Sequence, residues 1–191
     1  GQTLVVRGAT SALGQAAVNL AVDLDAHVIA TTRAAPRFAS LTALGARRAM
    51  LEGPALASQL RELHAAGVDA VLDLVGTSTV LDSLASVKRG GRVCLAGALG
   101  GLEPLRDFSP VFQVPGAVHL SAFGSFLFGT PRFPLTEVPL QSIVDKAAAG
   151  TYKFGPARVF QFDQIQEAHR LMESNGANGK LVVVTPSVAR R

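Results

Sequence analysis

The sequence is poor in residues that build disulfide frameworks and multi-cysteine metal sites. Its 191 residues include one cysteine, Cys94, which excludes an internal disulfide and a zinc site made of several cysteines. A lone cysteine is typical of a reducing compartment, and we expect a cytoplasmic protein. No signal peptide is visible, and the chain does not begin with methionine. We therefore expect a truncated chain or a product of proteolysis.

Metal-ligand spacings and nucleophile motifs are also missing. Four histidines, at positions 27, 64, 119 and 169, lie far apart, and no two of them have a metal-ligand spacing such as H-x-x-x-H. The sequence contains no G-x-S-x-G turn and no Ser-His-Asp order. We therefore expect no metal site in this chain and assign no catalytic residue to it.

Charge is modest and evenly spread. The 18 Lys and Arg exceed the 14 Asp and Glu to give a net charge of +4, which suits solubility and an anionic cofactor better than nucleic acid. Residues 108–131 form a stretch of 24 residues without Asp, Glu, Lys or Arg, but several prolines and glycines interrupt it. We expect neither a nucleic-acid nor a membrane partner.

The first 33 residues have the pattern of a nucleotide-binding strand, helix and strand. Thr3 to Val6 is a short apolar run that stops before Gly8, where a turn can begin. From Leu13 to Leu24, apolar or small residues recur every three or four positions, which predicts a helix packed on a sheet. Val28 to Ala30 then resumes the strand pattern.

The turn between this strand and helix, ATSALG at 9–14, retains only the last glycine of the dinucleotide fingerprint G-x-G-x-x-G. Gly14 allows the helix and strand to pack closely, while Gly8 and the small Ala9 permit the tight turn. Ser11 replaces the middle glycine, and its hydroxyl can donate to a phosphate. The free N–H groups and the dipole of the helix start attract anions in any case. Taken alone, the turn is equally compatible with an ordinary strand-to-helix connection.

Strand and helix signals alternate through the first two thirds of the chain, which predicts a parallel sheet with right-handed crossovers. Six strands with a reversal after the third predict a Rossmann-type doubly wound sheet of order 3-2-1-4-5-6, whose crevice lies between strands 1 and 4. The strands are expected at 3–6, 28–30, 48–51, 70–75, 92–96 and 117–123, and the later helices at 36–44, 55–66 and 79–87.

Beyond about Ser125 the pattern changes to a C-terminal α/β tail. We expect a helix at 140–149, a strand leading into a helix at 160–172 with Asp163 as its N-cap, and a closing strand at 181–184. The chain therefore divides into a dinucleotide-binding domain at 1–125 and a C-terminal segment at 126–191.

Seven short motifs occur in a characteristic order: GATSALG at 8–14, ATTR at 30–33, LGA at 44–46, DLVG at 73–76, GGRV at 90–93, AG at 96–97 and GKLVV at 179–183. In these the sequence resembles the medium-chain dehydrogenase/reductase superfamily, within it the zinc-independent quinone oxidoreductase-like branch. The resemblance covers essentially the whole chain but only the C-terminal part of such an enzyme. We expect the family's N-terminal GroES-like substrate domain to be missing from this chain. In the family, the segment that corresponds to residues 126–191 returns to that domain. Apolar surface that the domain would cover should therefore be exposed, or be covered by another copy or by a rearranged tail.

The resemblance implies the cofactor-binding part of an NADPH-dependent oxidoreductase that transfers hydride to quinones or other activated alkenes and carbonyls. This chain alone is expected to be inactive. A zinc-dependent alcohol dehydrogenase, an enoyl reductase of the same superfamily and a non-enzymatic NADPH-binding or dimerisation module remain the alternatives. Related enzymes dimerise through the sixth strand, so we expect a homodimer through Ala117–Phe123 and a quinone- or enone-like small-molecule substrate.

The resemblance also implies where the cofactor lies. Thr10, Ser11, Ala12 and Leu13, flanked by Gly8 and Gly14, should line the pyrophosphate. Asp73, Val75 and Gly76 should lie beside the adenosine, and Gly97, Ala98 and Leu99 near the nicotinamide. A loop-capping carboxylate is an equally good interpretation of Asp73, and a simple turn is as good an interpretation of the glycines after the fifth strand.

The end of the second strand predicts NADPH as the cofactor. NAD-binding enzymes place Asp or Glu there to hold the ribose 2′-hydroxyl, and NADP-binding enzymes replace it and supply arginine. Here Thr32 takes the acidic position, and Arg33 and Arg37 follow with no acidic residue between Thr31 and Arg37. Solvated arginines at a helix start are the alternative. For Arg7, at the end of the buried first strand, we expect a carboxylate partner.

Overall fold

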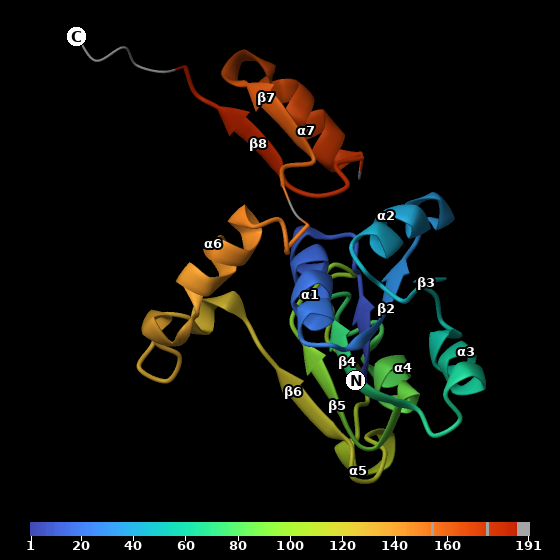
Figure 1. The fold of residues 1–191 in the computed structure, drawn as a ribbon. Coiled ribbons are helices and arrows are strands. Elements are labelled where there is room, and N and C mark those ends of the chain that lie inside the picture. Colours follow the sequence, from blue (N-terminus) through green and yellow to red (C-terminus); the bar gives the residue numbers. More distant parts are fainter. Residues whose placement is uncertain (154, 175, 187–191) are drawn as a thin grey trace.

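A six-stranded parallel sheet forms the centre of the protein in the computed structural model, which describes residues 1–153, 155–174 and 176–186. The strand order is β3-β2-β1-β4-β5-β6, which confirms the predicted doubly wound arrangement (Figure 1). All five neighbouring pairs are parallel. The strands are β1 (Thr3–Arg7), β2 (His27–Thr32), β3 (Arg48–Leu51), β4 (Val68–Asp73), β5 (Val87–Leu95) and β6 (His119–Ala122).

Helices bury both faces of this sheet because successive strand residues point to opposite sides. Val5 belongs to a core cluster with α3 and α4, and the next residue, Val6, belongs to a second cluster with α1 and α2. The helices of this part are α1 (Ala12–Asp23), the 3₁₀ turn η1 (Ala35–Arg37), α2 (Phe38–Ala43), α3 (Leu56–Leu63), α4 (Val80–Ser86) and α5 (Pro110–Gln113).

Element ends differ from the sequence expectation at several places. The expected helix at 36–44 divides into η1 and α2, and the helix expected to reach residue 66 ends at Leu63. Strand β5 begins at Val87, five residues early, because a bulge in its pairing with β4 lets the strand continue past the glycines at 90 and 91. The sixth strand, expected at Ala117–Phe123, is shorter because Ala117 adopts a left-handed conformation with φ of 59°.

The C-terminal part contains α6 (Leu140–Ala148) and a small unit in which β7 (Arg158–Gln161) pairs in parallel with β8 (Leu181–Val184) beside α7 (Ile165–Glu173). Figure 1 shows this unit projecting beyond the carboxyl ends of the central strands. The prediction of Asp163 as N-cap is wrong. The helical turn begins earlier, at η4 (Phe162–Gln164), and the Gln161 and Gln164 side chains form its capping box. Two further 3₁₀ turns, η2 (Ser125–Leu127) and η3 (Leu135–Glu137), precede α6.

Polar contacts attach residues 146–153 to helix α1. Asp23 accepts hydrogen bonds from the Lys146 ammonium and from the Tyr152 hydroxyl, the latter at 3.1 Å. The hydrogen bond from Lys146 lowers the pKa of the Asp23 carboxyl. The Asn19 side chain accepts from the Lys153 N–H at 2.7 Å and donates to its carbonyl at 3.3 Å. Part of the segment after residue 125 therefore packs on the sheet domain, and the division at 125 stays a prediction.

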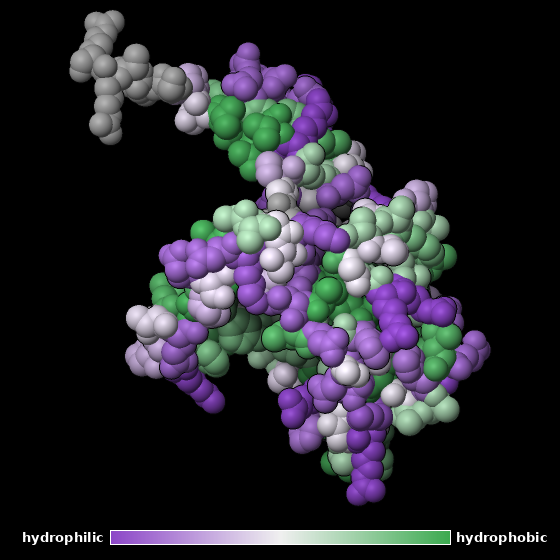
Figure 2. All heavy atoms as spheres, in the orientation of Figure 1, coloured by the Kyte–Doolittle hydropathy of each residue, from purple (hydrophilic) through white to green (hydrophobic). Residues whose placement is uncertain are grey.

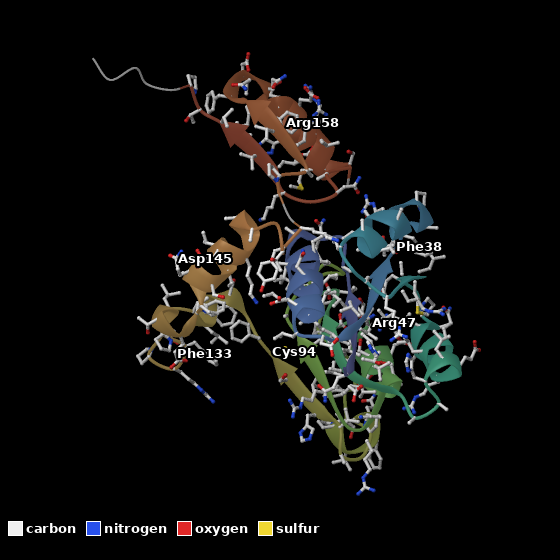
Figure 3. All side chains as sticks on the ribbon, viewed as in Figure 1. Phe38, Arg47, Cys94, Phe133, Asp145 and Arg158 are labelled. Atoms are coloured by element: carbon white, nitrogen blue, oxygen red, sulfur yellow. The ribbon has the colours of Figure 1, made fainter. Side chains whose placement is uncertain are left out.

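Apolar side chains are exposed between residues 99 and 144, including Phe112 and Phe126 at 88% and 83%. Other rings in this region pack together around Phe123, which makes edge contacts with Phe128 at 5.2 Å and Phe133 at 5.5 Å between centroids. Figure 3 marks the position of Phe133. Figure 2 shows a second hydrophobic area over β8. Within the described residues, no helix combines the length and apolar character needed to cross a membrane.

Strand β6 lies at one edge of the sheet, and all four of its residues are exposed. It carries no proline or charged side chain to prevent pairing with another strand. We therefore propose that two copies associate through antiparallel β6 strands around a twofold axis. Leu120→Lys should convert a dimer to a monomer in light scattering at tens of micromolar, because it places like charges across the axis.

The control is Leu24→Lys, which adds the same charge at an exposed position after α1 and should leave the dimer intact. A monomeric parent protein, or a dimer that survives Leu120→Lys, would contradict this interface.

Candidate functional site

The turn from Gly8 to Gly14 connects β1 to α1 and is held by backbone hydrogen bonds. The Ala9 N–H donates to the Thr31 carbonyl at 3.1 Å, which fixes the turn against the end of β2. Gly8 has φ of 74°, a conformation that favours glycine. Ser11 is the N-cap of α1, and its Oγ accepts from the Gly14 N–H at 3.0 Å. The Ser11 hydroxyl hydrogen can still donate to a ligand.

Gly14 has the packing role that its place in the fingerprint implies. A Cβ at this position would lie 2.6 Å from both the Ala9 Cα and the Gly8 carbonyl oxygen. These are backbone atoms, which cannot move aside without displacing β1 or α1. Gly14 therefore allows the close approach of helix and strand, and it contributes no surface to a ligand.

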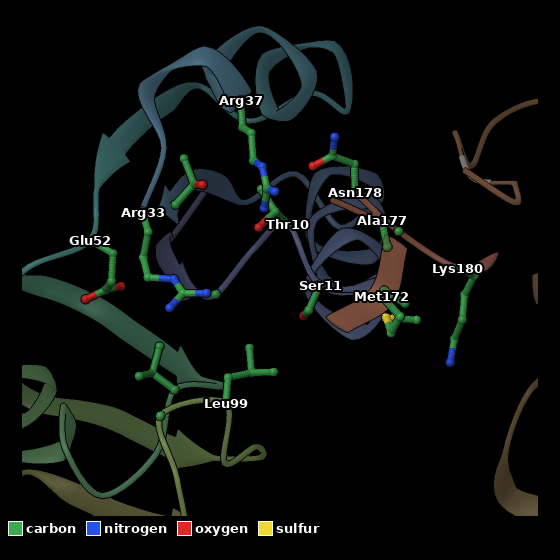
Figure 4. Close-up of a pocket in the computed structure, with 16 residues that line it drawn as sticks. Thr10, Ser11, Arg33, Arg37, Glu52, Leu99, Met172, Ala177, Asn178 and Lys180 are labelled. Carbon is green, nitrogen blue, oxygen red and sulfur yellow. The ribbon is translucent and has the colours of Figure 1, made fainter. Parts of the chain in front are cut away.

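A cavity of about 460 Å³ lies at the carboxyl ends of the strands, beside this turn (Figure 4). Nine of the fifteen residues proposed from the sequence line it: Gly8, Thr10, Ser11, Ala12, Thr32, Arg33, Arg37, Val75 and Leu99. The structure thus brings together residues from the ends of β1, β2, β4 and β5. This is the crevice in which doubly wound folds bind ligands.

Six proposed residues do not line the cavity: Leu13, Gly14, Asp73, Gly76, Gly97 and Ala98. Leu13 is exposed on α1. Gly76 and Gly97 pack against each other, since a Cβ on Gly76 would be 3.0 Å from the Gly97 carbonyl oxygen. A Cβ on Gly97 would in turn lie 2.5 Å from the Leu74 carbonyl oxygen. These glycines allow close packing of the loops after β4 and β5.

Asp73 caps the loop after β4. The side chain is fully buried, and Oδ1 accepts from the Val75 and Gly76 N–H groups at 2.9 Å each. Oδ2 accepts from the Thr79 hydroxyl at 2.9 Å and the Ser83 hydroxyl at 2.6 Å. The sequence left two interpretations of Asp73 open, and these hydrogen bonds are those of a loop-capping carboxylate. Asp73 therefore positions Val75, which does line the cavity.

Arg7 lies beneath the cavity and pairs with two carboxylates, which confirms the expected pairing. Its guanidinium is 1% exposed and contacts Glu52 and Asp82. Burial opposes its charge, but the hydrogen bonds from Arg7 to Glu52 and the nearby carboxylates raise the pKa of Arg7 overall. Sequence reasoning missed Glu52, which follows β3 and lines the cavity. The sequence could have indicated Glu52, because it directly follows the expected third strand and the carboxyl ends of parallel strands meet at one edge of a sheet.

The opposite wall comes from the C-terminal unit, which sequence reasoning also missed. Met172, Ala177, Asn178, Gly179 and Lys180 line the cavity, and Figure 4 shows Met172, Ala177 and Asn178 beside α1. The Gln15 amide joins the two walls by donating to the Thr10 carbonyl at 3.0 Å and the Asn178 carbonyl at 3.2 Å. The motif GKLVV at 179–183 contained two of these residues.

The end of β2 contributes the basic side of the cavity. Thr32 is buried, and its hydroxyl oxygen accepts from the Ala34 N–H at 3.3 Å, so it shapes the turn that follows. Arg33 and Arg37 extend from that turn to the cavity, and Lys180 adds a third cation from the other wall. The one lining carboxylate among the described residues, Glu52, is paired with Arg7. The cavity therefore favours an anion.

No group of three or more His, Cys, Asp or Glu side chains that could hold a metal ion occurs within residues 1–153, 155–174 and 176–186. Cys94 lies on β5, partly exposed and with a free thiol.

Comparison with known proteins agrees with this architecture. The family model described as zinc-binding dehydrogenase matches residues 44–183. The chain belongs to this family, part of the medium-chain dehydrogenase/reductase superfamily, and corresponds to its C-terminal cofactor-binding part. This confirms the superfamily inferred from the ordered motifs.

Individual relatives are distant in sequence. A probable quinone oxidoreductase of Schizosaccharomyces pombe is 27% identical over 96% of this chain and 55% of its own length. A mycobacterial protein solved in complex with NADPH is 25% identical with a TM-score of 0.82, covering 96% of this chain and 56% of that chain. An NAD-dependent alcohol dehydrogenase structure is 28% identical with a TM-score of 0.77, covering 96% and 51%. The chain spans about half the length of the curated relatives it matches.

The packing at Gly14 gives a prediction for stability. Gly14→Ala should lower the free energy of unfolding by about 1–3 kcal/mol, because the added methyl group overpacks against backbone. Urea denaturation followed by circular dichroism measures the change. Gly53→Ala is the matched control, since no atom beyond its two chain neighbours lies within 4 Å of its added Cβ, and it should alter stability by less than about 1 kcal/mol. Equal effects of the two substitutions would contradict the packing role of Gly14.

Proposed function

We propose that this chain is the cofactor-binding part of an NADP(H)-dependent oxidoreductase that reduces quinones or other activated alkenes and carbonyls. The observation that carries the proposal is the anion-favouring cavity at the carboxyl ends of the strands, with Arg33 and Arg37 at its rim. The S. pombe relative named as a probable quinone oxidoreductase and the mycobacterial NADPH complex support it.

We infer one direction for a dinucleotide in the cavity. The pyrophosphate would lie at Thr10, Ser11 and Ala12, where the Ser11 hydroxyl and the positive end of the α1 dipole are available. The adenosine ribose would lie toward Arg33 and the nicotinamide toward Leu99. When bound, the nicotinamide would supply the hydride, and the protein would supply orientation and exclusion of water.

Charge near the ribose supports NADPH over NADH. Arg33 can make two parallel N–H···O bonds to a 2′-phosphate, and Arg37 adds a second positive charge. Hydrogen bonds to charged groups contribute about 1.5–3 kcal/mol each, so one or two, discounted for the exposure of Arg33, give about a tenfold to hundredfold preference. Thr32, which takes the position of the usual ribose-binding acid, has no charge to oppose this.

Calorimetric titration with NADPH and NADH tests cofactor choice. We expect tighter binding of NADPH, and Arg33→Ala should reduce that affinity by about tenfold and weaken its dependence on salt. Arg48→Ala is the matched control, because Arg48 is an exposed arginine at the start of β3, at the other end of the strand from the cavity. Equal or tighter binding of NADH would instead favour a cofactor choice like that of the similar NAD-dependent alcohol dehydrogenase.

Turnover separates an enzyme from a binding module. In full-length protein, steady NADPH oxidation with 1,4-benzoquinone or 9,10-phenanthrenequinone supports the reductase, while tight binding without oxidation of any acceptor supports a non-enzymatic module. For residues 1–191 alone we expect NADPH binding without quinone reduction, because two domains normally enclose the nicotinamide in this superfamily. Measurable quinone reduction by this chain would contradict that expectation.

A further inference from the structure

Glu52 lies at the adenosine-ribose end of the proposed cofactor site, on the side of the cavity where Arg33 lies (Figure 4). A free carboxylate at this end of a dinucleotide cleft accepts hydrogen bonds from ribose hydroxyls and repels a 2′-phosphate. The sequence places no acid at the end of β2, but the fold brings one to the same place from the end of β3. Whether Glu52 behaves as a free carboxylate therefore affects which cofactor fits.

Both oxygens of Glu52 already have partners. The Arg7 Nε donates to Oε1 at 3.1 Å and to Oε2 at 3.2 Å, and Arg7 Nη2 also donates to Oε1. The Thr31 hydroxyl donates to Oε2 at 2.6 Å. The Glu52 side chain is 9% exposed, so little of it is left for solvent or ligand. Arg7 thus compensates the charge of Glu52, and Arg7 and Thr31 occupy both of its oxygens.

Helix α4 keeps Arg7 in this position. Nη1 donates to Asp82 at 2.7 Å, to the Ser83 hydroxyl at 3.0 Å and to the Thr79 carbonyl at 3.3 Å. Arg7 is 1% exposed and does not line the cavity, so its side chain faces a ligand indirectly, through Glu52. Its own backbone continues directly into Gly8 and the phosphate turn.

We propose that Arg7 is a positioning residue that neutralises and orients Glu52 and thereby allows a ribose 2′-phosphate at this site. The inference rests on the proposed binding of NADP(H). Its consequence is a cofactor preference that depends on a residue beneath the site as well as on the arginines that face it.

The net charge of the Arg7–Glu52 pair gives an ordered set of variants. The pair is neutral in the parent protein, carries −1 in Arg7→Met and +1 in Glu52→Gln, and is neutral again in the double variant. We expect the preference for a 2′-phosphate to fall about three- to tenfold in Arg7→Met, to rise in Glu52→Gln, and to return toward the parent value in the double variant. A purely structural role of Arg7 would change the affinity for every adenine nucleotide by a similar factor.

The experiment compares binding of adenosine 2′,5′-bisphosphate and 5′-AMP by calorimetry, because these probes differ only in the 2′-phosphate. The readout is the ratio of their dissociation constants. Arg48→Met serves as the matched control, since it removes one positive charge outside the cavity and should leave the ratio unchanged. Circular dichroism establishes that each variant is folded.

The outcomes separate this inference from the proposed function. Binding of both probes with a parent preference for the bisphosphate, but an unchanged ratio in Arg7→Met and Glu52→Gln, overturns the role of Arg7 alone. No preference in the parent protein overturns the NADP(H) proposal and this inference with it. If Arg7→Met does not fold, Glu52→Gln still decides: a raised ratio in favour of the bisphosphate supports the inference, and an unchanged or lowered ratio overturns it.

Discussion

The close approach of helix α1 to strand β1 determines where the rest of the cavity lies. Gly14 allows this approach because even a methyl group would collide with the Ala9 and Gly8 backbone. The same approach aims the first turn of α1 at the carboxyl ends of the strands, and Ser11 completes it as N-cap. An anion site at this helix start therefore follows from packing, and the two missing fingerprint glycines do not prevent it.

A second constraint is the group of buried charges directly beneath the turn. Taking Arg7 out of water is unfavourable unless its carboxylate partners are placed well, and they come from two other elements, Glu52 after β3 and Asp82 in α4. Removing one member would leave a buried charge uncompensated, which typically destabilises by about 3–5 kcal/mol. The network therefore holds the ends of β1 and β3 next to the start of α4. The cavity lies beside these strand ends.

The order of the sheet could be predicted from the sequence because it depends on alternation and on the apolar character of strands buried on both faces. Strands β3 and β8 have the expected bounds. Element ends were less predictable where local backbone features intervene: a bulge extends β5, and the left-handed Ala117 shortens β6. The Gln161–Gln164 capping box likewise moves the start of the last helical segment ahead of Asp163.

The candidate site was predictable where it follows one connection and not where it needs distant segments. The turn after β1 and the arginines after β2 were found because each is local to a strand end. Glu52 and the residues around Asn178 line the same cavity, but they reach it from a third strand and from the C-terminal unit. Asp73 shows the reverse case, since a carboxylate at a strand end can serve the loop itself instead of a ligand.

The two walls of the cavity are attached with unequal strength. The wall at the α1 turn belongs to the buried core, whereas the wall at 172–180 meets that turn through the exposed hydrogen bond from Gln15 to Asn178. A neutral hydrogen bond contributes about 0.5–1.5 kcal/mol, and water competes for this one. A ligand that contacted both walls would add its own interactions to this attachment and would thereby stabilise the position of the C-terminal unit.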